Sequence, residues 1–174
     1  MPEPQLQLQL QLQLQLLRPD HAPAILAFER ENRAYFAASI PDRGDEYFEQ
    51  FDERHRLQLA DQEAGECHYH VLVDTAGEVL GRVNLVDVAD GVAELGYRIA
   101  ERAAGRGLAT RAVRAVCELA ADGYGLTTLR ARATLDNAAS RAVLARVGFT
   151  VTGQTRLNGR PALTYLRSVT GPRQ

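Results

Sequence analysis

The chain has 174 residues, of which 45% are hydrophobic and 24% charged, and its net charge at pH 7 is −2. These values are typical of one globular domain with a single core, and they give no electrostatic reason to expect nucleic-acid or membrane binding. No apolar run is long enough to cross a membrane, and no charged-then-apolar leader opens the chain, so we expect a cytoplasmic protein. Cys67 and Cys117 stand far apart, which argues against a disulfide framework.

Glutamine and leucine alternate strictly over residues 5–16. A period of two is typical of a strand with one apolar face, and we expect the stretch near residues 14–18 to form the first strand. Residues 1–13 are then either an extension of that strand or a disordered low-complexity tail, ahead of a single domain over residues 14–170. A glutamine–leucine strand also favours self-association, so both a monomer and a homodimer fit the sequence.

Proline, glycine and aspartate divide the rest of the chain into elements. We expect one helix to start at Pro19, with Asp20 as its N-cap, and to reach Phe36, and a second helix to run from Asp45 to Gly65. The elements expected after these are strands over 67–74, 79–88 and 92–100, a helix over 108–121, a strand over 129–135, a helix capped by Asp136 or Asn137 that ends at Val147, and strands over 151–157 and 162–169. This order predicts an α/β fold with a mixed central sheet and helices on both faces.

The most informative segment joins a predicted strand to a predicted helix and carries Gly105 and Gly107 one residue apart. Two glycines at such a junction let backbone N–H groups point at a ligand without side chains in the way. The start of the helix adds its unpaired N–H groups and its positive dipole end. Arg102 and Arg106 add positive charge beside the turn. The segment therefore predicts an anion site that fits a pyrophosphate.

Two familiar phosphate-binding loops do not match this turn. No Gly-Lys-Ser/Thr follows Gly107, and Thr110 stands where a dinucleotide fingerprint needs a third glycine. The turn instead follows the pattern R-x-x-G-x-G, with Ala93-Glu94-Leu95-Gly96-Tyr97-Arg98-Ile99 before it. The block that follows the turn consists of Thr134-Leu135-Asp136-Asn137-Ala138-Ala139-Ser140 and then Arg146-Val147-Gly148-Phe149.

These three blocks, in this order, resemble the GNAT N-acetyltransferase superfamily, and the resemblance covers residues 16–169. The variant with Asn137 and Ser140 is most similar to the branch that acetylates ribosomal-protein N-termini. The resemblance implies the GNAT fold, with a mixed, mostly antiparallel central sheet of about seven strands. It also implies acetyl-CoA as co-substrate, with the pyrophosphate at the glycine turn and the pantetheine along Leu95–Ile99. The implied cofactor-binding residues are Leu95, Gly96, Tyr97, Arg98, Ile99, Arg102, Gly105, Arg106, Gly107, Leu108, Ala109, Thr110, Asn137 and Ser140.

Direct acetyl transfer needs a base for the amine and a proton donor for the leaving thiolate. By resemblance, Glu94 is the first candidate for the base; the alternative is a solvated or salt-bridged strand glutamate. Ser140 is the candidate that assists the thiolate, whereas Asn137 either contacts the cofactor or only caps a helix. Many family members have a tyrosine acid four residues before the Gly-Phe turn, but Leu144 stands there in this chain and cannot donate a proton.

The resemblance leaves the amine acceptor open. We expect a protein or peptide N-terminal amine; the alternatives are a small molecule such as an amino acid, polyamine or antibiotic, or a catalytically silent acyl-CoA-binding module. An acidic cleft favours cationic small molecules, whereas a long open groove favours a peptide.

Other polar and aromatic side chains have weaker interpretations. His68 and His70 share one face of a strand, but no third ligand is visible, so we expect no metal; the alternative is that they line the acceptor cleft. Tyr97 and Tyr165 are expected in the core or the cleft wall rather than in catalysis. Four further side chains are candidates to face the acceptor: Asn32, Arg33, Tyr35 and Asn84.

Overall fold

The computed structural model describes residues 12–170. Residues 1–11, and with them most of the predicted extension or tail, lie outside the described residues. The elements are β1 (Gln13–Leu16), η1 (Pro19–His21), α2 (Ala22–Glu31), α3 (Arg33–Ala37), α4 (Asp45–Glu49), α5 (Phe51–Glu63), β2 (His68–Val73), β3 (Val79–Ala89), β4 (Val92–Ile99), η2 (Glu101–Ala103), α6 (Leu108–Asp122), β5 (Thr128–Thr134), α7 (Ala138–Arg146), β6 (Thr150–Leu157) and β7 (Arg160–Ser168).

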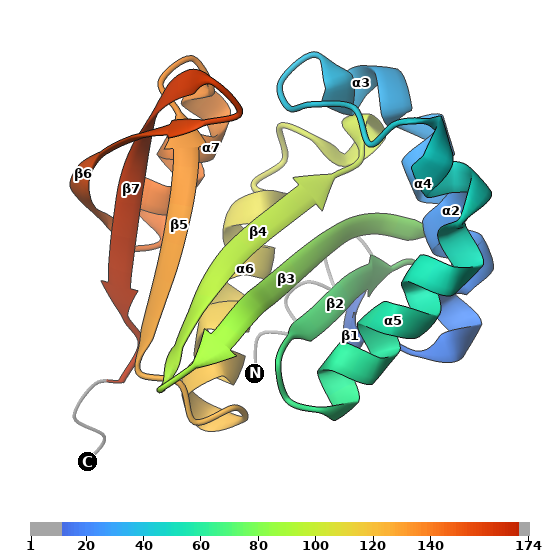
Figure 1. The fold of residues 1–174 in the computed structure, drawn as a ribbon, viewed down its shortest axis with the longest axis horizontal. Helices are drawn as coiled ribbons and strands as arrows, with labels where there is room; N and C mark the ends of the chain where they lie inside the picture. The colour runs from blue at the N-terminus through green and yellow to red at the C-terminus, as the bar shows by residue number, and fades with distance from the viewer. Residues whose placement is uncertain (1–11, 171–174) are drawn as a thin grey trace.

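Within the described residues, seven strands form one sheet in the order β1-β2-β3-β4-β5-β7-β6. All neighbouring pairs are antiparallel except β4 with β5, which confirms the predicted mixed, mostly antiparallel sheet. Helices α6 and α7 lie behind the sheet in Figure 1, whereas α5 lies in front of the β1–β2 edge. Helices therefore cover both faces, as the sequence predicts. No helix within residues 12–170 combines the length and apolar character needed to span a membrane.

Strands β4 and β5 are paired only at their beginnings. The paired residues run from Val92 with Thr128 to Glu94 with Arg130. Beyond Glu94, β4 continues to Ile99 with β3 as its partner on one side, while β5 continues alongside β7. The two strands separate toward the top of the sheet in Figure 1. Among the described strands, this separation leaves one side of β4 without a partner next to the glycine turn.

The early helices differ from the prediction. The first predicted helix is divided into η1, α2 and α3, because Pro23 lies in the first turn of α2 and Asn32 ends that helix by donating from Nδ2 to the Phe28 carbonyl at 2.9 Å. Asp20 is not an N-cap: its carboxylate accepts a hydrogen bond from Arg18 Nε at 3.0 Å. The second predicted helix is likewise divided, at Gln50 between α4 and α5.

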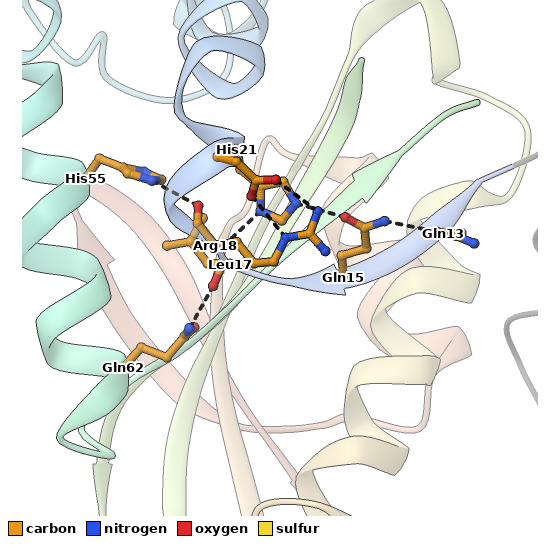
Figure 2. Close-up of polar contacts among 8 residues, drawn as sticks. Gln13, Gln15, Leu17, Arg18, His21, His55 and Gln62 are labelled. Atoms are coloured by element: carbon orange, nitrogen blue, oxygen red, sulfur yellow. Dashed lines mark hydrogen bonds and ion pairs between the residues drawn. The ribbon is translucent and has the colours of Figure 1, made fainter. Parts of the chain in front are cut away.

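A polar network anchors the end of β1 to helix α5 and strand β2. Gln62 Nε2 donates to the Leu17 carbonyl at 3.0 Å, and Gln62 Oε1 accepts from the Tyr69 amide at 3.0 Å. His55 Nε2 donates to the Arg18 carbonyl at 3.1 Å. Figure 2 shows Gln62 and His55 reaching the chain just after β1 from the same helix. One helix thus satisfies two main-chain carbonyls where the chain leaves the sheet.

His21 completes this network, and we call the whole group the β1 network: Gln15, Leu17, Arg18, His21, His55, Gln62 and Tyr69. His21 Nδ1 accepts a hydrogen bond from the Arg18 amide at 3.0 Å, so the ring proton lies on Nε2, which donates to Gln15 Oε1 at 2.8 Å. Figure 2 shows this ring lying between Arg18 and Gln15. Burial lowers the pKa of His21, which favours the neutral ring that this geometry requires.

Candidate active site

The glycine turn has the backbone conformation that the sequence predicts. Gly105 and Gly107 have φ values of 76° and 74°, which side-chain-bearing residues rarely adopt. Gly107 is also the N-cap residue of α6, and no side chain in the part of the chain that the structure describes caps this helix. A Cβ atom at either glycine would have no neighbour within 4 Å, so the space above the turn is open. The first amides of α6 therefore lie beside open space.

A cleft of about 490 Å³ connects this turn with the gap between β4 and α7. One wall comes from the end of β4 and the turn, a second from the start of α7, and a third from α3 and the residues after it. The residues that line the cleft are Tyr35, Phe36, Ser39, Ile40, Tyr97, Arg98, Ile99, Ala103, Ala104, Gly105, Gly107, Leu108, Ala109, Thr110, Asn137, Ala139, Ser140, Ala142, Val143 and Arg146.

Asn137 and Ser140 meet at the start of α7. Asn137 is the N-cap residue, and its Oδ1 accepts a hydrogen bond from the Ser140 amide at 3.2 Å. The Ser140 hydroxyl points toward β4, where the Tyr97 phenol donates to Ser140 Oγ at 3.1 Å. Burial raises the pKa of Tyr97, so its phenol carries its proton in neutral solution.

Glu94 lies where β4 and β5 separate, because its pair with Arg130 is the last between the two strands. Its carboxylate accepts a hydrogen bond from Arg132 at 2.9 Å and is 22% exposed. Side chains alternate along a strand, so Glu94 and Tyr97 point to opposite faces of the sheet. The salt-bridged alternative considered for Glu94 is thus present in the structure, at the edge of the gap.

Five of the predicted residues do not line the cleft, although the structure describes all of them. Besides Glu94, these are Leu95, which is buried in the core, and Gly96, which is exposed. Arg102 donates to Glu78 at 2.8 Å, and Arg106 is exposed. The remaining predicted residues lie together along the cleft: Tyr97, Arg98, Ile99, Gly105, Gly107, Leu108, Ala109, Thr110, Asn137 and Ser140.

The sequence reasoning missed much of the cleft wall. Phe36 and Ile40 resemble core residues, and alanines such as Ala139 carry no chemical signal. Tyr35 lines the cleft, as one interpretation of the first helix allowed, whereas Asn32 bonds within the chain, to Phe28 and to the Glu101 amide at 3.0 Å.

Two other acceptor candidates and the second tyrosine lie outside the cleft lining. Arg33 is ion-paired with Asp42 at 2.7 Å and with Asp45 at 2.8 Å. Asn84 has a buried Oδ1 without a hydrogen-bond partner among residues 12–170, and Tyr165 is in the core.

The charged side chains that line the cleft are Arg98 and Arg146. Arg98 stacks over the Phe36 ring at 4.9 Å and lies 3.5 Å from Glu29, a carboxylate that is 1% exposed and also pairs with Arg43 at 2.8 Å. Burial lowers the pKa of Arg98 to about 10, which leaves it charged at neutral pH. Among the described residues, no carboxylate lines the cleft.

His68 and His70 lie away from the cleft. His68 stacks on Tyr124 with a ring separation of 3.7 Å, and Tyr124 donates its hydroxyl proton to His70 Nε2 at 2.5 Å, since His70 Nδ1 donates to the Val83 carbonyl. Burial lowers the pKa of His70 to about 4. The interpretation of these histidines as cleft residues is therefore wrong. Within residues 12–170, no group of three or more His, Cys, Asp or Glu side chains is arranged to hold a metal ion.

The comparisons with known proteins agree with this architecture. Residues 11–150 match the family described as "Acetyltransferase (GNAT) domain". "Putative ribosomal N-acetyltransferase YdaF" of Bacillus subtilis (strain 168) is 32% identical over 130 residues, which cover 74% of this chain and 69% of that protein.

Two solved structures are similar across most of their length. The ribosomal-protein-S5-alanine acetyltransferase from Vibrio fischeri has a TM-score of 0.84 at 22% identity, covering 90% of this chain and 92% of that one. RimL, a ribosomal L7/L12 α-N-protein acetyltransferase in complex with coenzyme A, has a TM-score of 0.80 at 21% identity, covering 90% and 93%. The fold, the family match and the sequence relative agree, and the chain belongs to the GNAT acetyltransferase family as an N-acetyltransferase.

Proposed function

We propose that this enzyme uses acetyl-CoA and transfers the acetyl group directly to the α-amine of a protein or peptide N-terminus. The observation that carries the proposal is a single cleft running from the uncapped start of α6 to the Tyr97–Ser140 pair. Binding of acyl-CoA requires a phosphate-binding end, and transfer of its acyl group requires a proton donor near the sulfur. The names of the similar ribosomal-protein acetyltransferases support the choice of acceptor.

The pyrophosphate is proposed to bind at the amides of Leu108, Ala109 and Thr110. These groups belong to the first turn of α6, where the helix dipole favours negative charge. The left-handed conformation at Gly105 and Gly107 keeps side chains away from the phosphates. Arg106, which is exposed at the turn, adds positive charge near this position, whereas Arg102 is paired with Glu78.

The pantetheine is proposed to lie along Leu95–Ile99, where β4 has no partner on the β5 side. Its amide groups can bond to the free strand edge much as an added strand does. Gly96, which is exposed and without a side chain, allows close approach to this edge. This arrangement brings the thioester into the gap, between Glu94 on one face of the sheet and Ser140 on the other.

In this proposal the amine attacks the thioester carbonyl from the Glu94 side, and the new N–C bond forms as the carbonyl becomes tetrahedral. Glu94, through a water molecule, takes the proton that the amine releases, while Arg132 fixes the direction of the carboxylate. The C–S bond then breaks, its electron pair goes to sulfur, and Ser140 supplies a proton to the thiolate. No covalent enzyme intermediate is needed.

The charge of the cleft favours a peptide N-terminus over a polycation. Arg98 and Arg146 are the charged side chains of its lining, and Glu94 at the edge of the gap is already paired with Arg132, so a polyamine or an aminoglycoside meets positive charge there. Like charges at such a site cost binding free energy, whereas a neutral α-amine is compatible with it. Apolar surface from Phe36 and Ile40 suits a small uncharged first residue.

The test is thiol release from acetyl-CoA with a panel of amines: peptides with free N-termini, single amino acids, spermidine and an aminoglycoside. We expect turnover with peptides and acetylation of the α-amine, read by mass spectrometry, with Glu94→Gln and Ser140→Ala strongly reduced. Preferred turnover of spermidine or the aminoglycoside would overturn the acceptor assignment. Tight binding of acetyl-CoA without turnover of any amine would favour a silent binding module.

A further inference from the structure

The phenol of Tyr97 and the hydroxyl of Ser140 form a contact across the cleft between residues 43 positions apart in the chain. Tyr97 comes from β4 and Ser140 from the first turn of α7, and their oxygens are 3.1 Å apart. Both residues line the cleft, and Tyr97 is only partly exposed. A hydrogen bond at this distance holds the serine oxygen against β4.

Ser140 is held at two points. Its amide donates to Asn137 Oδ1 at 3.2 Å, which fixes the main chain, and its hydroxyl oxygen accepts from Tyr97. A serine hydroxyl has one proton and two lone pairs, so accepting from Tyr97 leaves its own proton free to donate elsewhere. Leu144, one helical turn further along α7, is fully buried and offers no proton to the cleft. Ser140 lines the cleft, so its proton remains available to a ligand there.

We propose that Tyr97 is a positioning residue for acetyl transfer, which orients Ser140 toward the leaving sulfur and restores its proton. This inference rests on the proposed function. As the C–S bond breaks, sulfur takes the Ser140 proton, and Ser140 Oγ takes the phenol proton of Tyr97 as its own O–H bond breaks. Water then reprotonates the Tyr97 phenolate, using the proton that the amine released, so the reaction has no net proton change.

The relay solves an acidity problem. A serine hydroxyl alone is a far weaker acid than a thiol, whose ordinary pKa is about 8.5, so donating its proton without a second donor leaves a costly alkoxide. Coupling to the Tyr97 phenol moves the negative charge onto a group that is a far stronger acid than an aliphatic alcohol, although burial raises the pKa of this phenol above its ordinary value. The pair then acts as one proton donor with two oxygens.

Tyr97→Phe removes one oxygen and keeps the ring. We expect kcat to fall about 10-fold or more, with the KM for acetyl-CoA within about twofold of the wild-type value. Tyr97→Phe should have no further effect in a Ser140→Ala background, because the two residues act as a unit. Tyr124→Phe is the matched control: its phenol also bonds to one side chain, His70, but lies away from the cleft, so kcat should not change.

A second variant preserves packing in case Tyr97→Phe destabilises the fold. Replacing Tyr97 with 3-fluorotyrosine gives a more acidic phenol, and the alkaline limb of the kcat–pH profile should shift to lower pH. If Tyr97 only packed in the cleft wall, this replacement would leave the pH profile unchanged. A Tyr97→Phe variant with the kcat of the wild type would overturn the inference. So would a double variant whose loss of kcat equals the product of the losses in Tyr97→Phe and Ser140→Ala. If the wild type acetylates no amine, the proposed function fails instead, so the two failures are distinguishable.

Discussion

The β1 network and the cleft use their polar groups in opposite ways. At the β1 network, Gln62, His55 and His21 bind main-chain groups of neighbouring segments (Figure 2). In the cleft, the start of α6 has no side-chain cap from residues 12–170, and Gly105 and Gly107 face open space. Polar groups that are paired within the chain stabilise the fold, whereas groups left open at a concave site are available to a ligand. Variants in the two regions should therefore separate stability from activity.

The largest effect is expected at the glycine turn. Gly107→Val displaces the backbone from its φ of 74° and should weaken acetyl-CoA binding about 1,000-fold, since two lost charge-assisted hydrogen bonds are worth about 4 kcal/mol. Gly125→Val is the matched control. Gly125 has a φ of 65° and the same open surroundings, but it lies outside the cleft lining, so this variant should lose stability and keep its affinity. Calorimetric titration measures the affinity for acetyl-CoA, and thermal unfolding measures the stability. Equal affinities for the two variants would contradict the assignment of the glycine turn as the acetyl-CoA site.

The next largest effect is a pH-dependent loss of stability at His70. Its folded pKa of about 4 lies below the ordinary value of 6.5, so the unfolded chain binds more protons between these values. The contribution of neutral His70 to the free energy of unfolding is fully present above pH 6.5 and declines by about 3 kcal/mol as the pH falls to 4. Urea unfolding at several pH values should give a flatter profile for His70→Gln than for the wild type. Parallel profiles would show that His70 does not carry the effect.

At the edge of the gap, Glu94→Gln should lower kcat roughly 10- to 100-fold, because an amide cannot accept the amine proton. Glu53→Gln is a matched control: Glu53 also pairs with an arginine, Arg56, but on the exposed surface of α5. Its kcat should equal that of the wild type. Steady-state kinetics with a peptide acceptor measure kcat for both variants. An unchanged kcat in Glu94→Gln would show that Glu94 is not the base.

The smallest effect belongs to the β1 network. Gln62→Ala removes hydrogen bonds to the Leu17 carbonyl and the Tyr69 amide, at a cost of about 1–2 kcal/mol in the free energy of unfolding. Activity at neutral pH should stay within about twofold of the wild type, since the network lies apart from the cleft. Denaturant unfolding and the peptide assay check the two parts. A large loss of kcat in the still-folded variant would contradict the separation of the two regions.

The sequence predicts the fold well where local chemistry determines it. Asp90-Gly91 and Asn158-Gly159 all have positive φ and join pairs of strands that the sequence predicts, and α6 begins at Leu108, next to the predicted turn. The early helices were predicted less well. The Asn32 side chain bonds at the point where the first predicted helix is divided, and the Arg18 side chain bonds to Asp20 where that helix was expected to start. The hydrophobic pattern alone reveals neither position.

The candidate site is only partly visible in the sequence. The glycine turn and the Asn137–Ser140 cap are local, so their residue types reveal them. The Tyr97–Ser140 contact joins residues 43 positions apart, and no local pattern predicts it. Cleft residues such as Ile40 look like ordinary core, because apolar side chains fill cores and clefts alike.

The most direct test of the contrast between the two regions is a titration of the isotopically labelled enzyme with acetyl-CoA, followed by the chemical shifts of backbone amides. The largest changes are expected at residues 105–110 and 97–99, with the amides of Leu17 and Arg18 unchanged. Changes concentrated in the β1 network, or no change at the start of α6 at saturating ligand, would contradict the account.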